Sequence, residues 1–85
     1  MNDHLSTEEV SWILDHLAGT VRDMIRDGKI EAVRLPSGFR VPKAEALRLA
    51  RERIEAEAGR KLSDRELEQL VDELIATNRE RLSRA

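Results

Sequence analysis

The 85-residue sequence contains no cysteine, which excludes a disulfide and any zinc site built on cysteine ligands. It has no apolar run approaching the roughly 20 residues that a membrane-spanning helix needs, and its polar start does not resemble a signal peptide. We therefore expect one soluble, cytoplasmic domain without membrane contact. Trp12 and Phe39 are the only aromatic residues, so the core must consist mainly of Leu, Ile, Val and Ala.

Residue groups that could carry out catalysis are also scarce. His4 and His16 are the two histidines, and neither has carboxylate partners at the spacing of metal ligands. The sequence has no glycine-rich phosphate loop and no nucleophile with an arranged base. We therefore expect no metal, no cofactor and no enzymatic activity.

The basic residues are concentrated in one segment, although the net charge of the chain is -2. Residues 20–43 hold six basic and three acidic side chains, whereas residues 1–19 hold four acidic and no basic ones. Residues 44–85 are nearly balanced, with nine basic and ten acidic groups. A localised basic segment is typical of a nucleic-acid footprint. The alternative is a solvated surface on which pairs such as Asp23 and Arg26 weakly stabilise a helix.

Two segments, Leu5–Val10 and Leu62–Leu67, share a serine followed three residues later by a glutamate. In such a capping box the serine side chain and the glutamate side chain satisfy backbone N–H groups at the start of a helix. The pattern therefore predicts that one helix begins near Thr7 and another near Asp64. The first segment also places Leu5 where it can pack on Val10.

The apolar periodicity predicts four helices with a hairpin between the second and the third. The helices are expected at about Thr7 to Leu14, Leu17 to Asp27, Pro42 to Gly59 and Asp64 to Leu82. The expected core positions of the last two helices are Leu47, Ala50, Ile54 and Ala58, and then Leu67, Leu70, Val71, Leu74, Ile75 and Leu82. The short Gly59–Leu62 connection predicts an antiparallel helical hairpin.

Gly28 is predicted to end the second helix. The β-hairpin that follows is predicted to turn at Pro36-Ser37-Gly38. Strict alternation predicts one apolar face made of Val33, Leu35, Phe39 and Val41, with Arg34 and Arg40 on the other face. We expect Phe39 to be buried beneath the hairpin.

A helix and an adjacent hairpin that both present arginine outward fit a groove flanked by phosphates, and we predict a DNA-binding module. Thr20 and Arg22 are assigned to base edges, and Arg26 and Lys29 to flanking phosphates. The hairpin contact is assigned to Arg34, Ser37, Gly38 and Arg40, and Lys43 is included in the DNA-binding set.

The ordered pieces of residues 5–47 resemble the excisionase-like, MerR-type winged helix-turn-helix family. The pieces are Leu5-Ser6-Thr7-Glu8-Glu9-Val10, Thr20-Val21, Ile25-Arg26-Asp27-Gly28-Lys29-Ile30, Ala32-Val33-Arg34 and Phe39-Arg40-Val41-Pro42. The resemblance implies that the second helix enters the major groove and that the wing contacts the backbone or the minor groove. Family members include excisionases, transcription regulators and antitoxins.

The chain departs from that family between the two helices. Asp15, His16 and Leu17 stand where a glycine, an apolar residue and a serine-like cap are usual, and Asp15 is a candidate cap. Ala18 and Gly19 precede Thr20, so base readout is expected to depend mainly on Arg22.

The predicted fold is mainly α with a small β-hairpin wing: a winged helix-turn-helix over residues 5–43, followed by a helical hairpin over residues 44–85. The predicted function is that of a transcription regulator or an excisionase-like architectural factor on double-stranded DNA. The alternative is an antitoxin or adaptor whose C-terminal helices bind a recombinase, toxin or polymerase. Trp12 either packs on the third or fourth helix, which we favour, or anchors another chain. Leu70 and Leu74 are the expected interface of a homodimer.

Overall fold

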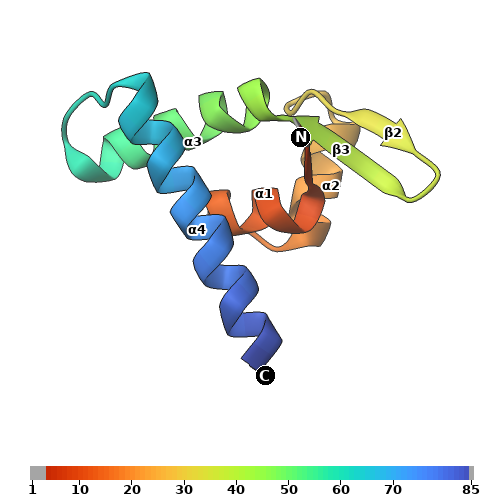
Figure 1. Cartoon of the computed structure of the whole chain (residues 1–85). Coiled ribbons are helices and arrows are strands. Elements are labelled where there is room, and N and C mark those ends of the chain that lie inside the picture. The colour runs from red at the N-terminus through yellow and green to blue at the C-terminus, as the bar shows by residue number, and fades with distance from the viewer. Residues whose placement is uncertain (1–3, 85) are drawn as a thin grey trace.

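The computed structural model describes residues 4–84, which form four helices and a three-stranded antiparallel sheet (Figure 1). The elements are β1 (His4–Ser6), α1 (Thr7–Leu14), α2 (Ala18–Arg26), β2 (Val33–Leu35), β3 (Gly38–Pro42), α3 (Lys43–Ala58) and α4 (Asp64–Arg84). The fold is therefore mainly helical with a small β-sheet, as predicted. One buried apolar cluster contains residues from the first helices, the sheet, α3 and α4.

Both capping boxes are present. The backbone N–H of Ser6 donates to Glu9 Oε1 at 2.8 Å, and the N–H of Glu9 donates to Ser6 Oγ at 3.1 Å. Ser63 and Glu66 make the same reciprocal pair, at 3.3 and 3.2 Å. The predicted starts of the first and last helices are confirmed.

The strand β1 is a feature that the sequence did not predict. It pairs with β3, so the sheet order is β1-β3-β2. Leu5 lies opposite Val41 in this pairing, and both side chains are buried. Three residues are too few to show an alternating pattern, and the partner strand lies far along the chain, so no local signal indicates this strand.

The turn between α1 and α2 differs from the expectation for Asp15. Asp15 has φ 56° and ψ 41° and ends α1 in the left-handed conformation, which aspartate tolerates better than most residues. It does not cap α2. Leu17 occupies the N-cap position of α2, and its side chain makes no capping hydrogen bond.

Helix α2 buries one apolar face and ends before Gly28, as predicted for its end. Val21 is buried, and Met24 and Ile25 pack against the core cluster. Gly28, at φ 78°, follows the helix, and the N–H of Lys29 donates to the carbonyl of Met24 at 2.9 Å. Glycine adopts this positive φ without strain, so the chain leaves α2 toward the sheet.

The β2–β3 hairpin has the predicted strands but a different arrangement of faces. Arg34 pairs with Phe39, so these side chains share a face, whereas Val33 pairs with Arg40. Val33 and Leu35 are exposed. The prediction that they share one apolar face with Phe39, and that Arg34 and Arg40 share the other face, is wrong. The two-residue turn pairs even-numbered with odd-numbered positions, and paired residues face the same way.

Phe39 is half-buried, not buried as predicted. Val41, two residues further along the same face of β3, is fully buried in the core. The hairpin extends away from the helices toward its tip (Figure 1). The face of β3 that carries Val41 and Phe39 is therefore buried near α3 and half-exposed toward the tip of the hairpin.

Helix α3 begins one residue later than predicted, and its buried face is broader than predicted but excludes Ala58. Pro42 is the last residue of β3 and the N-cap of α3. The buried residues are Ala46, Leu49 and Ala50, whereas the predicted core residue Ala58 is exposed. Leu47 and Ile54 are half-buried. They pack against the core cluster and Ala50 is buried, as predicted, because the sheet, α1 and α4 all contact α3.

Helix α4 turns back across α1, and its C-terminal turns extend beyond the body (Figure 1). Leu67 and Val71 are buried, and Ile75 packs on the core cluster. Leu70 and Leu82, by contrast, are exposed, so the predicted single stripe is wrong at these positions. Leu70 lies about 100° around the helix from Val71, at the edge of the buried face. Leu82 lies in the last turns of α4, which extend beyond the body (Figure 1).

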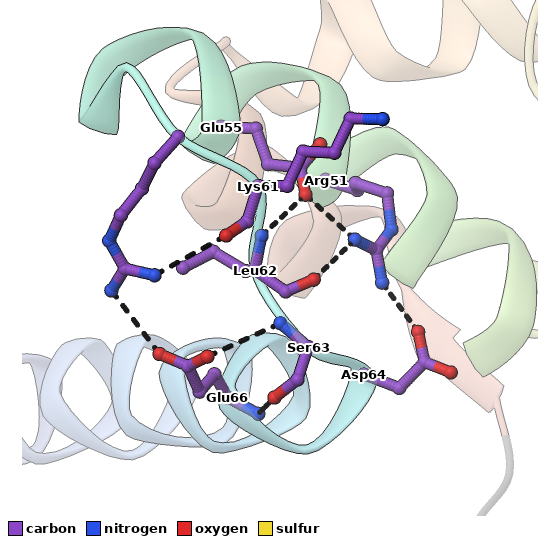
Figure 2. Close-up of polar contacts among 8 residues, drawn as sticks. Arg51, Glu55, Lys61, Leu62, Ser63, Asp64 and Glu66 are labelled. Atoms are coloured by element: carbon purple, nitrogen blue, oxygen red, sulfur yellow. Dashed lines mark hydrogen bonds and ion pairs between the residues drawn. The ribbon is translucent and has the colours of Figure 1, made fainter.

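A cluster of polar contacts fixes the connection between α3 and α4 (Figure 2). The N–H of Leu62 donates to Glu55 Oε2 at 2.7 Å, and Arg51 donates both to the carbonyl oxygen of Leu62 at 2.7 Å and to Asp64. The Leu62 N–H, together with the nearby Arg51 guanidinium, lowers the pKa of the Glu55 carboxyl. Both backbone groups of the buried Leu62 are thus paired, and α4 leaves the connection in a defined direction.

Candidate nucleic-acid interface

An open groove of about 1040 Å³ lies between α1, α2 and the β2–β3 hairpin. Six of the predicted DNA-binding residues line it: Arg22, Arg26, Arg34, Ser37, Gly38 and Arg40. Among the described residues that line this groove, Glu8 is the one acidic side chain. Four guanidinium groups against one carboxylate make the groove basic, despite the negative net charge of the chain.

Helix α2 contributes one face to the groove. Ala18, Arg22 and Arg26 follow one another at spacings of four and all line it. Arg26 also contacts Asp23 at 3.5 Å, but both side chains are largely exposed, so this pair holds the guanidinium weakly. Thr20, two residues from Arg22, is turned about 200° away on the helix, and it is exposed outside the groove.

The hairpin wall holds two arginines in defined positions. Arg40 donates to the backbone oxygen of Phe39 at 2.8 Å and to Ser37 Oγ at 3.3 Å, so it braces the turn. The guanidinium carbon of Arg34 lies 6.0 Å from the ring centroid of Phe39, its cross-strand partner. This cation–π geometry orients Arg34 on the face that lines the groove.

Helix α1 forms a third wall that the sequence interpretation missed. Glu8, Ser11 and Trp12, at the i, i+3, i+4 spacing of one helix face, line the groove. This spacing is visible in the sequence, but nothing local indicates that the hairpin lies opposite. Trp12 is half-buried here, and whether it anchors another chain stays a prediction.

Two further predicted DNA-binding residues lie outside the groove. Lys29 is exposed after the end of α2. Lys43 lies at the start of α3, where its ammonium group is 2.9 Å from Glu68 and 3.4 Å from Asp72. The hydrogen bond with Glu68 is the main cause of a raised pKa for Lys43. Lys43 therefore ties α3 to α4, and we leave it out of the interface.

A second, apolar surface involves α3 and α4. Ile54, Leu70 and Leu74 border a shallow hollow of about 350 Å³ together with Glu73 and Thr77. The predicted interface residues Leu70 and Leu74 are thus brought together, and Trp12 is not among the residues that line this hollow. We call Ile54, Leu70 and Leu74 the α4 patch.

No protein-family model, curated protein or solved structure matches this chain. None of the helices in residues 4–84 combines the length and the low polarity that a membrane span requires. Within the same residues, no three His, Asp or Glu side chains form a group that could hold a metal ion.

Proposed function

We propose that this chain binds double-stranded DNA as a winged helix-turn-helix protein. The observation that carries the proposal is the basic groove between α2 and the hairpin, lined by four arginines. Phosphate contacts supply most of the affinity of DNA-binding proteins, and arginine can bind both phosphates and guanine edges. Helix α2 enters the major groove, and the hairpin follows the adjoining backbone or minor groove.

The residues have separate roles in this proposal. Arg22, on the groove face of α2, contacts a base edge, and Arg26, one turn later, contacts a phosphate. Arg34 and Arg40 contact the backbone from the hairpin, where Ser37 and Gly38 allow a close approach at the turn. Lys29, exposed after the end of α2, contacts a phosphate beside the groove. Thr20, turned about 200° from Arg22, does not reach the same base edges.

The biological role that we propose is occupation of a promoter or a recombination site. A neighbouring integrase gene would favour excision, and a neighbouring toxin gene would favour an antitoxin. Occupation of a promoter and occupation of a recombination site both require duplex binding, so that binding is tested first.

Replacing Arg22 by alanine is expected to weaken binding to the preferred site by about 1–3 kcal/mol, with little effect on other sequences. Arg40→Ala is expected to weaken binding to all sequences alike, because it removes a backbone contact. The measurement is fluorescence anisotropy at low salt, on a site selected from a random-sequence library and on a scrambled duplex.

The matched control is Arg65→Ala, which removes an exposed arginine of α4 that does not line the groove. Its affinity should equal that of the unmodified chain on both duplexes. The absence of measurable duplex binding at low salt, for any sequence of the library, would reject the proposed function.

The α4 patch favours a second candidate function, self-association through α4 into a two-fold dimer. Such a dimer would place two copies of α2 about 34 Å apart on DNA, one helical turn. Sedimentation velocity at micromolar concentration is expected to show a dimer that dissociates when Leu70 and Leu74 are both replaced by serine. An unmodified chain that stays monomeric would contradict the dimer and leave the patch to a different protein, as the antitoxin or adaptor alternative requires.

A further inference from the structure

Leu17 is the most exposed large hydrophobic side chain in the described part of the chain, at 79%. It occupies the N-cap position of α2, where Ser, Thr, Asp or Asn would satisfy a backbone N–H and leucine cannot. The side chain therefore contributes neither to the cap nor to the core. Folding gives no reason for a leucine at this position.

The surroundings of Leu17 indicate what it contacts. It lines the basic groove together with Ala18 and Arg22, so it lies at the end of α2 that opens into the groove. The next residues are Ala18 and Gly19, and a Cβ added at Gly19 would meet nothing within 4 Å. The start of α2 is thus bare of polar side chains before Thr20, and the helix can approach a surface closely there.

We propose that Leu17 contacts the C5-methyl group of a pyrimidine, in practice thymine, in the major groove beside the base pair that Arg22 contacts. This inference rests on the proposed function. The first residues of a recognition helix usually reach base edges, and the C5-methyl of thymine is the apolar group presented in the major groove. A protein surface is a weaker match for Leu17, because two arginines share its wall of the groove.

The test uses the full chain and the selected duplex with each thymine replaced in turn by deoxyuridine, which lacks only the C5-methyl group. At one position the unmodified chain is expected to lose about fourfold in affinity, the fold-change for exposing one buried methyl group. Leu17→Ser should bind the thymine and deoxyuridine duplexes equally. The serine variant should fold, because the leucine is exposed and serine is a favoured N-cap residue.

Leu35→Ser is the matched control, since Leu35 is an exposed leucine on the hairpin wall of the same groove. It should retain the fourfold discrimination. A duplex with cytosine at the sensitive position should bind more tightly when that cytosine is 5-methylated, and this gain should disappear in Leu17→Ser.

Equal affinity for thymine and deoxyuridine at every position, with salt-dependent binding intact, would reject the role of Leu17 and leave the proposed function standing. Discrimination that survives in Leu17→Ser would assign the methyl contact to another residue and would also overturn the inference. The absence of any duplex binding by the unmodified chain would reject the proposed function itself.

Discussion

Raising the salt concentration from roughly 0.05 to 0.2 M is expected to weaken binding to duplex DNA about 150-fold. Each neutralised phosphate contributes about -0.9 to the slope of log affinity against log salt. Four cations are assigned to phosphates, namely Arg26, Arg34 and Arg40 in the groove and Lys29 beside it, so a slope of about -3.6 is expected. Lys43 is not counted, because its ammonium group lies between Glu68 and Asp72 of α4. Anisotropy titrations at several salt concentrations give the slope directly.

Single arginine variants sharpen this measurement. Arg26→Gln should reduce the magnitude of the slope by about 1, because it removes one phosphate contact. Arg65→Gln, outside the groove, should leave the slope unchanged. A slope near zero for the unmodified chain would mean that the groove does not neutralise phosphates, whatever affinity is measured.

Replacing Leu67 by alanine is expected to lower the free energy of unfolding by about 2–5 kcal/mol, as for other buried leucines. Leu67 is 2% exposed and belongs to the core cluster that α4 shares with the rest of the chain. Leu70, three residues later, is 38% exposed, and Leu70→Ala should cost less than about 1 kcal/mol. Urea unfolding gives both values, with the fluorescence of Trp12, the single tryptophan, as one signal.

Urea unfolding of the same variants also tests whether residues 5–43 fold separately from α4. Because Leu67 and Val71 belong to the same buried cluster as Val10 and Ile13, the fluorescence and the circular dichroism should change in one common transition. Equal losses for the two leucine variants would show that the buried face of α4 is misassigned. A separate transition for the helical signal would show that α4 unfolds independently.

The parts of the fold that the sequence predicts are those with local physical causes. The two capping boxes indicate where α1 and α4 begin, because serine and glutamate act within three residues of each other. Gly28 and Gly59 indicate where α2 and α3 end, because glycine adopts a positive φ without a Cβ penalty. The spacing of Val21, Met24 and Ile25 indicates which face of α2 packs on the core.

The predictions fail where contacts between segments that are distant in the sequence determine which side chains are buried. The faces of the hairpin depend on which residue opposes which, and the alternation within each strand does not reveal that Arg34 opposes Phe39. The exposure of Leu70 and Leu82 depends on how α4 crosses α1. Lys43 counted as part of the basic segment, but its partners Glu68 and Asp72 lie on another helix.

In the candidate site, too, features with local causes are predicted and features that depend on tertiary contacts are not. Arg22 and Arg26 share a face of α2 by helical spacing, so the sequence brings them together correctly. The contribution of α1 through Ser11 and Trp12 requires that the hairpin lie beside α1, which only the tertiary structure reveals.

The contact between the first helix and the last has a consequence for synthesis on the ribosome. Helix α1 is synthesised roughly 50 residues before Leu67 and Val71, which belong to the same core as Val10 and Ile13. At roughly 5–20 residues per second, the apolar face of α1 waits several seconds for these partners. During that interval the apolar face of α1 lacks its partners from α4, so the native core is completed only after translation of α4.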